Sequence, residues 1–208
     1  MRLSDWITPT TPAGTALFLM WNGYHVFSIP HRELVRSPHS VRFSGVGGKR
    51  SSCTESFVDC AWREGVEEIG TVITSIDSAS QTHLFRADGS LTAISLVDEA
   101  ISPRLVLEKQ NHTGHGSLSV SDPSYYLVAF DASLNAPPTP RNELAALIYM
   151  QDAHLALMQD GTEWAIADLL QRDARIECQA GVSLAPATTL IPHGTAKFLV
   201  HWLHERSC

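Results

Sequence analysis

The first half of the chain consists of short apolar runs separated by turn residues, a pattern typical of β-strands. The runs 15–21 and 24–29 flank Asn22-Gly23, a dipeptide that favours the type I′ turn of a tight hairpin. A polar stretch at 31–39 is interpreted as a loop. The strands predicted after it are 41–44, which leads into the glycines at 45, 47 and 48, and then 71–76, 82–87, 90–97, 103–109 and 124–132.

One segment, residues 54–69, has the apolar spacing of an amphipathic helix instead. Thr54 is its predicted N-cap, and Gly70 is the residue expected just beyond its C-terminus. The apolar side chains that would pack this helix on a sheet are Phe57, Val58, Ala61 and Trp62. Towards the C-terminus, two more helices are predicted at 162–172 and 193–205.

The composition indicates a folded globular chain. Apolar residues make up 44% of the 208 positions and charged residues make up 18%, which is the range of globular proteins. A chain of this length can bury a substantial core. A single domain spanning residues 1–208 is therefore expected.

The net charge of −7 argues against nonspecific binding to nucleic acids or anionic membranes, because both require a basic surface. Phosphate binding is still possible, since bound metal ions can carry the positive charge. The sequence contains no apolar run of membrane-spanning length, and its first residues lack the apolar segment of a signal peptide. Its four cysteines show no CxxC spacing, so neither a zinc knuckle nor a disulfide framework is indicated. We expect a cytoplasmic protein.

Three carboxylates give the predicted helix its chemistry. Glu64, Glu67 and Glu68 are spaced i, i+3 and i+4, which places them on one helix face. A solvated acidic face is one interpretation, and a site for a divalent cation is the other. Mg²⁺ binds a few carboxylates and takes its remaining ligands from water and substrate phosphates. The preceding glycines favour the second interpretation, because they let the backbone approach such a ligand just before the N-terminus of a helix.

Residues 48–71 resemble the Nudix box, whose pattern is G-x5-E-x7-R-E-U-x-E-E-x-G-U with U aliphatic. The residues at the spacing of that pattern are Glu55, Arg63, Glu64, Glu67, Glu68 and Gly70. The resemblance implies an α+β fold, an α/β/α sandwich in which a mixed sheet is flanked by helices, over about residues 13–160. It also implies hydrolysis of a nucleoside diphosphate linked to another moiety, with Mg²⁺ or Mn²⁺ as the cofactor.

The resemblance also implies roles for individual residues. Glu55 and Arg63 would pair and hold the loop against the helix. Glu143, six residues before Tyr149, is similar to a loop glutamate that orients or deprotonates the attacking water in some members of the family. The catalytic base would then be Glu64 or Glu143. The metal ligands would be Glu64, Glu67 and Glu68, together with the main-chain carbonyl of Gly48.

Several other polar residues were considered for the site. Arg50 lies next to the glycine loop and is a candidate ligand for a substrate phosphate. Arg32 and Arg36 are interpreted as solvated loop charges. His112 and His115 have a metal-like spacing, but no cysteine or carboxylate pair accompanies them, so they are interpreted as loop residues.

The chain departs from the pattern in three ways. Six residues instead of five separate Gly48 from Glu55, Gly65 takes an aliphatic position inside the helix, and Thr71 replaces the last aliphatic residue. A glycine inside a helix costs roughly 1 kcal/mol relative to alanine. These departures leave a second hypothesis open: a catalytically weak or inactive Nudix-fold module that binds a nucleotide as a sensor.

The C-terminal segment, about residues 161–208, exceeds the minimal fold that the resemblance implies. Its apolar helices would shape a substrate pocket or form the interface of a homodimer. The expected partner is a small nucleotide-type diphosphate, and no signature in the sequence identifies it further. Isopentenyl diphosphate isomerase, a different catalytic class with the same fold, ranks third because no matching cysteine-containing motif occurs.

Overall fold

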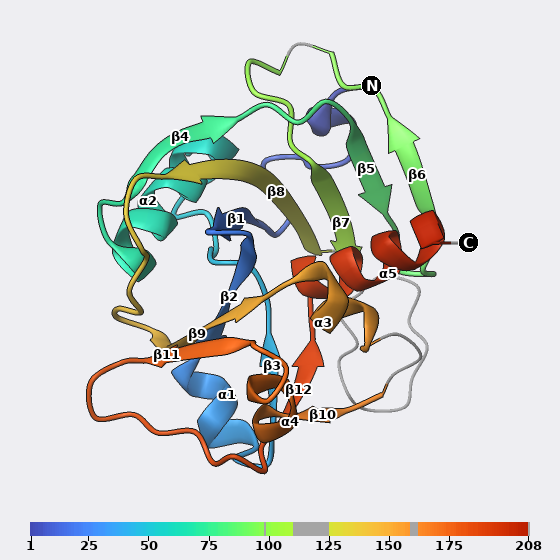
Figure 1. Cartoon of the computed structure of the whole chain (residues 1–208). Helices are drawn as coiled ribbons and strands as arrows, with labels where there is room; N and C mark the ends of the chain where they lie inside the picture. Colours follow the sequence, from blue (N-terminus) through green and yellow to red (C-terminus); the bar gives the residue numbers. More distant parts are fainter. Residues whose placement is uncertain (98, 110–124, 159–161, 208) are drawn as a thin grey trace, which may run out of the picture.

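A nine-stranded mixed sheet lies at the centre of the molecule (Figure 1). The computed structural model describes residues 1–97, 99–109, 125–158 and 162–207. The strands of this sheet are β1 (Ala13–Trp21), β2 (Tyr24–Pro30), β4 (Ile73–Asp77), β5 (Thr82–Phe85), β6 (Leu91–Ile94), β7 (Leu105–Lys109), β8 (Tyr125–Leu134), β9 (Leu144–Met150) and β11 (Arg175–Cys178). Their order is β11-β9-β2-β1-β8-β7-β5-β6, and β4 also pairs with β8. The pairs β1–β8 and β5–β7 are parallel, and the others are antiparallel.

Three short strands form a second sheet in the order β10-β12-β3. These strands are β3 (Ser40–Phe43), β10 (Trp164–Ala165) and β12 (Thr189–Pro192). The helical elements are the 3-10 helix η1 (Leu3–Asp5), α1 (His31–Arg36), α2 (Phe57–Ile69), α3 (Asp152–Ala156), α4 (Ile166–Leu170) and α5 (Thr195–Ser207). Helix α2 packs on β1, β4 and β8, whereas α5 contacts β12 and α3.

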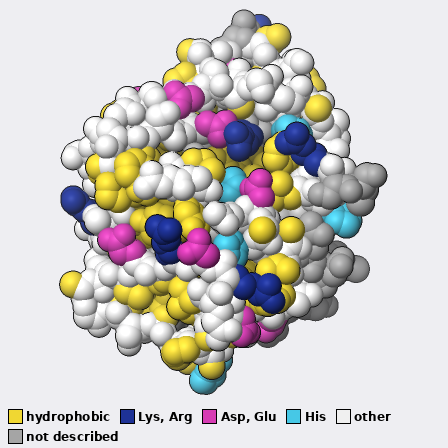
Figure 2. Space-filling model, viewed as in Figure 1, with side chains coloured by type: hydrophobic (Ala, Val, Ile, Leu, Met, Phe, Trp, Pro, Cys, Tyr) yellow, Lys and Arg dark blue, Asp and Glu magenta, His cyan; other side chains and the backbone are white. Residues whose placement is uncertain are grey.

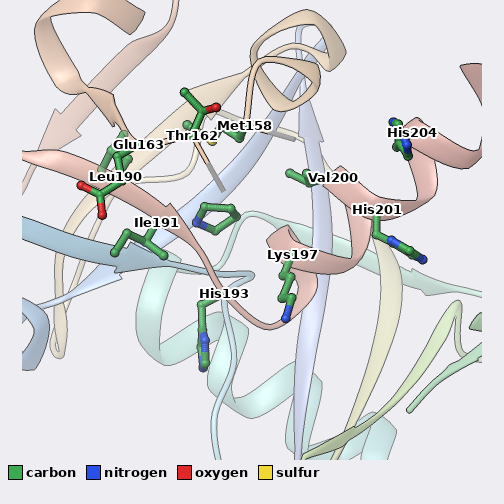
Figure 3. A pocket seen from close by; sticks show the side chains of 11 residues that line it. Met158, Thr162, Glu163, Leu190, Ile191, His193, Lys197, Val200, His201 and His204 are labelled. Carbon is green, nitrogen blue, oxygen red and sulfur yellow. The ribbon is translucent and has the colours of Figure 1, made fainter. Parts of the chain in front are cut away.

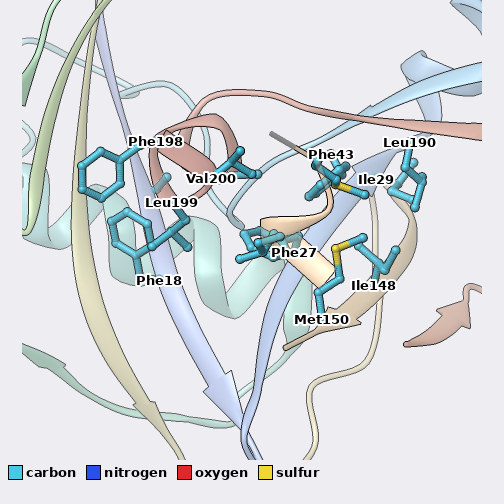
Figure 4. Packing of buried hydrophobic residues seen from close by; sticks show 14 of the residues in the cluster. Phe18, Phe27, Ile29, Phe43, Ile148, Met150, Leu190, Phe198, Leu199 and Val200 are labelled. Carbon is cyan, nitrogen blue, oxygen red and sulfur yellow. The ribbon is translucent and has the colours of Figure 1, made fainter. Parts of the chain in front are cut away.

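Strand β1 is buried on both faces, because a helix covers each face of the main sheet. Successive side chains of a strand point to opposite faces. Leu17 accordingly packs in one apolar cluster with Ala61 of α2, and Phe18 packs in the other with Phe198 of α5, with the two ring centroids 5.8 Å apart (Figure 4). Full burial of such a side chain contributes roughly 1.5–3 kcal/mol. The predicted α+β class, with a mixed sheet flanked by helices, is confirmed.

The strand predictions of the first half are confirmed, with ends that differ by at most three residues. In the predicted hairpin turn, Asn22 and Gly23 have φ values of 49° and 82°, as a type I′ turn requires at both central positions. Gly70 ends α2 with a φ of 86°, in agreement with its predicted position. These features depend on local chemistry, so the local sequence was sufficient to find them.

The interpretation of residues 31–39 as a loop was wrong, because the first six of them form α1. Glu33 of this helix is only 7% exposed. Its carboxylate accepts two hydrogen bonds from the Arg42 guanidinium of β3, at 2.9 and 3.0 Å. A charged pair with this forked geometry is among the stronger polar contacts in proteins. The helix therefore depends on a partner in another element, which its own sequence pattern does not contain.

The predicted start of the main helix was also wrong: α2 begins at Phe57, and Ser56 is its N-cap. The Ser56 hydroxyl accepts a hydrogen bond from the Asp59 N–H at 3.0 Å, which is the usual N-cap contact. Thr54 instead belongs to the preceding loop, which turns back so that Glu55 can face the helix. Serine is at least as favourable an N-cap as threonine, so the local capping preference is satisfied two residues later than predicted.

The C-terminal segment is less helical than the sequence indicated. The helix predicted at 162–172 is limited to α4, and two strands that the sequence did not predict, β11 and β12, follow it. Strand β11 pairs with β9, where Ile176 lies opposite Ile148. Strand β12 pairs with β3, where Leu190 lies opposite Val41. The C-terminal segment therefore belongs to both sheets. Its two four-residue strands form by pairing with strands that are distant in the sequence, so their own residues do not predict them.

Candidate active site

A cavity of about 420 Å³ lies between α2, the glycine segment and the strands β1 and β7. We call it the glutamate cavity. The charged and ionisable side chains that line it and carry the argument below are Glu64, Glu68, Glu143, Arg32, Lys109 and His193. Acidic groups and cationic groups therefore share one cavity of ligand-binding size.

The glycine segment reaches the cavity by running close beside β1. Thr15 N–H donates to the Gly48 carbonyl at 2.8 Å, and Leu17 N–H donates to the Val46 carbonyl at the same distance. Gly47 has a φ of 146°, and a Cβ atom at this position would lie 2.3 Å from the Thr15 carbonyl oxygen. Only glycine fits this approach. The Gly48 carbonyl, predicted as a metal ligand, is already engaged with β1 through one hydrogen bond.

Glu68 is the most deeply buried carboxylate of the cavity, with 7% of the residue exposed. One of its oxygens accepts a hydrogen bond from the Gly47 N–H at 2.9 Å. Burial raises the pKa of Glu68 to about 8, and the neighbouring charges of Glu64 and Glu143 add to the rise. A buried carboxylate with a strongly raised pKa is a typical feature of functional sites.

Glu64 lies beside the glycine segment, and its side chain is 15% exposed. A Cβ atom at position 48 would come within 2.3–2.6 Å of its carboxylate atoms, so the absence of a side chain at Gly48 makes room for this group. Burial also raises the pKa of Glu64, although the adjacent Arg63 opposes the rise. The geometry thus brings a second carboxylate to the same wall as Glu68.

Glu143 reaches the cavity from a distant part of the chain. The loop that carries it is tied to the end of α2: Arg141 N–H donates to the Glu68 carbonyl at 2.8 Å, and Asn142 Nδ2 donates to the Glu67 carbonyl at 2.7 Å. Glu143 is immediately followed by β9. Tyr149 lies near the end of that strand instead of at its start, and its hydroxyl donates to the Pro138 carbonyl at 3.0 Å.

Glu67 and Arg63 lie outside the set of residues that line the glutamate cavity. Arg63 Nη1 lies 2.8 Å from Glu64 Oε1 and 3.3 Å from Glu67 Oε2. Its Nε lies 2.8 Å from Glu55 Oε1, and its Nη2 donates to the Lys49 carbonyl at 3.1 Å. Arg63 therefore joins the loop before the helix to two of the helix carboxylates, and its hydrogen bonds to Glu55 and Glu64 raise its pKa.

The pairing of Arg63 with Glu55 is expected to make the protein less stable in acid. Its hydrogen bonds lower the pKa of Glu55 from 4.5 to about 2. This contribution to stability is therefore complete above pH 4.5 and is lost as the pH falls towards 2. We expect Glu55→Gln to lower the free energy of unfolding by about 1–2 kcal/mol at pH 7, measured by urea denaturation.

The same comparison at low pH provides the control for Glu55→Gln. The difference in unfolding free energy between the variant and the wild type should shrink as the pH falls below 4.5 and disappear below pH 2, once Glu55 is protonated in the folded wild type as well as in the unfolded one. A difference that stays constant across this range would contradict the assigned ion pair.

Lys109 and His193 are neighbours in the lining of the cavity, and the sequence did not single out either residue. Lys109 Nζ lies 3.2 Å from His193 Nε2. Burial and nearby arginines lower the pKa of Lys109 to about 8, and burial with the Lys109 charge lowers that of His193 to about 4. At neutral pH a charged lysine therefore donates to a neutral imidazole. These residues end β7 and follow β12, so only the fold brings them together.

Arg50, the predicted phosphate ligand, does not line the glutamate cavity. Its guanidinium donates to the Glu55 carbonyl at 2.7 Å and to the Cys53 carbonyl at 2.5 Å, and it lies 4.6 Å from the ring centre of Phe57. These contacts fold the loop that carries the additional residue. Arg32, interpreted from the sequence as a solvated charge, lines the cavity instead.

The carboxylates of the cavity have the donor chemistry of a site for a hard divalent cation. Glu64, Glu68 and Glu143 offer oxygen ligands, which Mg²⁺ and Mn²⁺ prefer, and their mutual repulsion contributes to the raised pKa of Glu68. They are not gathered around one point, since the described part of the chain contains no group of three His, Cys, Asp or Glu side chains arranged to hold a metal. Glu64 and Glu67 point to Arg63, so a cation would compete with that guanidinium for them.

His112 and His115 lie outside the described residues. Acidic and basic side chains are mixed on the face shown in Figure 2, and the described residues form no continuous basic area on it. Of the helices in the described ranges, none has the length and apolar character needed to cross a membrane.

Comparisons with known proteins identify similar folds at low sequence identity. No protein-family model and no curated protein matches the chain. Among solved structures, a NUDIX hydrolase from Nitrosomonas europaea is 12% identical over 69% of this chain, with a TM-score of 0.36. The match spans 58% of that protein's length. The E. coli ORF135 protein is 14% identical over 70% of this chain and 77% of its own length, with a TM-score of 0.39.

Proposed function

We propose that this protein is a metal-dependent hydrolase that cleaves a diphosphate bond in a nucleoside diphosphate linked to another moiety. The observation that carries the proposal is the combination, in one cavity, of carboxylates from α2 with cationic side chains from β7 and α1. Carboxylates suit a divalent cation, and lysine and arginine suit phosphate oxygens. The resemblance of residues 48–71 to the Nudix box supports the same chemistry.

Glu64 and Glu68 are the residues that would hold Mg²⁺ or Mn²⁺ in the cavity, with the Gly48 carbonyl as a further ligand. Glu67 would join them only by exchanging its contact with Arg63 for the cation. Such a cation, when bound, neutralises charge on the diphosphate oxygens and lowers the pKa of a water molecule. Both carboxylates stand on one helix within two turns, and α2 is packed firmly on the sheet. A rigid element of this kind keeps ligand groups in place.

The other residues of the cavity bind the substrate and move the proton. Lys109 and Arg32, which line the same cavity as the carboxylates, hold phosphate oxygens of the substrate. Glu143 or Glu64 accepts a proton from the attacking water. The water oxygen forms a bond to one phosphorus, the bond from that phosphorus to the bridging oxygen breaks, and two phosphate products leave.

A substrate screen tests the proposed function directly. Nucleoside diphosphate conjugates, nucleoside triphosphates and dinucleoside polyphosphates are incubated with Mg²⁺ or Mn²⁺, and the released phosphate products are measured. We expect turnover of at least one conjugate, and its loss when the metal is chelated. Absence of turnover on every compound, with nucleotide binding retained, would support a sensor module instead.

Lys109→Ala is expected to weaken substrate binding. Loss of the cation removes a charge-assisted contact to phosphate, so KM should rise about 10-fold. Because the pKa of Lys109 is lowered to about 8, the wild-type amine loses its proton, and with it affinity, as the pH rises through 8. Lys109→Arg should retain binding above that pH, since arginine stays protonated.

A matched control for Lys109→Ala is Arg86→Ala, which removes an exposed cation from the turn between β5 and β6. Its KM should equal that of the wild type at all pH values tested. An unchanged KM in Lys109→Ala would contradict the assignment of Lys109 to the phosphate, whatever the value in the control.

A further inference from the structure

A second cavity, of about 480 Å³, lies beside the glutamate cavity and is formed largely by the C-terminal segment. We call it the α5 pocket. Figure 3 shows side chains of α5, of β12 and of the segment after α3 around it. The residues used in the argument are Met158, Glu163, His193, Lys197 and Val200. Its volume is within the range of sites for small organic ligands.

The two cavities share one residue, His193, which lines both. This residue stands in the short turn between the end of β12 and the start of α5. Its N–H donates to the Phe43 carbonyl at 2.9 Å, and its own carbonyl accepts from Ala196 N–H at 3.0 Å. The shared wall is therefore held by backbone contacts on both sides, and a ligand in one cavity lies next to the other.

The lining of the α5 pocket is apolar within and polar at its edge. Met158 and Val200 are 2% and 8% exposed and belong to the apolar cluster on the α5 side of the sheet. Lys197 and Glu163 are exposed side chains of opposite charge. A group with apolar faces and an edge that both donates and accepts hydrogen bonds suits such a lining, whereas a second phosphate would require an excess of positive charge.

We propose that the α5 pocket binds the nucleobase of the substrate, while the diphosphate occupies the glutamate cavity on the other side of His193. The proposal rests on the proposed function, because that function places the diphosphate end of the substrate in the glutamate cavity. The nucleobase site itself does not require catalysis. A nucleobase has the required chemistry, because its ring faces are apolar and its edge carries donors and acceptors. Lys197 and Glu163 would then contact that edge.

Nucleoside binding without metal tests this site apart from hydrolysis. Wild-type protein is titrated with adenosine, guanosine, cytidine and uridine in the presence of a chelator, and binding is measured by ligand-observed NMR. We expect binding of at least one nucleoside, weakened at least fivefold by Lys197→Ala. Arg86→Ala, a surface cation that lines neither cavity, should bind like the wild type. Val200→Phe, which fills the pocket, should abolish binding, with circular dichroism reporting whether the variant folds.

The outcomes distinguish this inference from the proposed function. Nucleoside binding that depends on Lys197, without hydrolysis of any conjugate, would support the α5 pocket and overturn the hydrolase assignment. Hydrolysis of conjugates with no nucleoside binding, or with binding unaffected by both Lys197→Ala and a folded Val200→Phe, would overturn the nucleobase site alone. Binding of an aliphatic probe such as octanoate in the α5 pocket, with no binding of any nucleoside, would also overturn the nucleobase assignment.

Discussion

Replacing Glu68 with glutamine is expected to abolish metal-dependent hydrolysis while leaving the protein folded. Glutamine preserves the shape of the side chain, and its amide oxygen can still accept the hydrogen bond from Gly47 N–H. It carries no negative charge for a divalent cation, so kcat/KM should fall by at least about 100-fold. The measurement is the hydrolysis rate of the best conjugate from the screen, with Mg²⁺ and with Mn²⁺.

The thermal stability of Glu68→Gln separates a functional role from a structural one. Burial raises the pKa of Glu68 to about 8, so folding at pH 7 requires this carboxyl to bind a proton, a cost that the neutral glutamine does not have. We expect a Tm equal to or above that of the wild type. Glu67→Gln should also lose turnover, although Glu67 is half-exposed. Asp168→Asn, at an exposed carboxylate of α4, is the matched control. Full activity in both glutamate variants would contradict the assignment of Glu67 and Glu68 to the metal site.

Enlarging Gly65 is expected to destabilise the fold, although helix propensity alone predicts the opposite. Alanine is favoured over glycine inside a helix by roughly 1 kcal/mol. A Cβ atom at position 65, however, would lie 2.3 Å from Ile73 Cδ1 and 2.9 Å from Leu17 Cδ1. Overpacking of a core typically costs about 1–3 kcal/mol. We expect Gly65→Ala to lower the free energy of unfolding by about 1 kcal/mol, and Gly65→Val to lower it further.

A double-mutant cycle identifies the cause of that loss. Ile73→Val removes the Cδ1 atom that a side chain at position 65 would meet, so the combination Gly65→Ala with Ile73→Val should be more stable than the sum of the single changes predicts. Residues in contact commonly show coupling of about 0.5–3 kcal/mol. Urea denaturation of the four proteins measures it, and strictly additive changes would contradict a steric origin.

The glycine at position 65 illustrates what a sequence pattern leaves out. As a glycine at an aliphatic position of the box, it predicts a less stable helix. The packing shows instead that the absence of a side chain at position 65 lets the helix lie close to the sheet. Here α2 lies so close to β1 and β4 that Leu17 and Ile73 fill the space where a side chain would stand. The distance between a helix and a sheet depends on the side chains of both. The sequence of the helix alone therefore could not predict that position 65 has no room for a side chain.

The loop between Gly48 and Glu55, with its additional residue, is a second case in which contacts decide the role of a residue. In the sequence the additional residue is one of three departures from the box pattern. In the structure, Arg50 folds this loop through the carbonyls of Cys53 and Glu55, and Glu55 still meets Arg63. Arg50, the residue that was expected to bind phosphate, therefore has a structural role. Carbonyl partners carry no sequence signature, which is why the residue could not be assigned in advance.

Local sequence patterns were enough to predict the hairpin, most strands of the first half, the end of α2 and the carboxylates that α2 presents. All of these follow from turn chemistry and from periodicity within a few neighbouring residues. The three-dimensional packing, in contrast, places Glu64 and Glu68 at a cavity and Glu67 outside it, and it adds Glu143, Lys109 and His193 to the lining of that cavity. These three residues reach it from the start of β9, the end of β7 and the turn before α5. The contacts that place them join segments far apart in the chain, and no local pattern encodes such contacts.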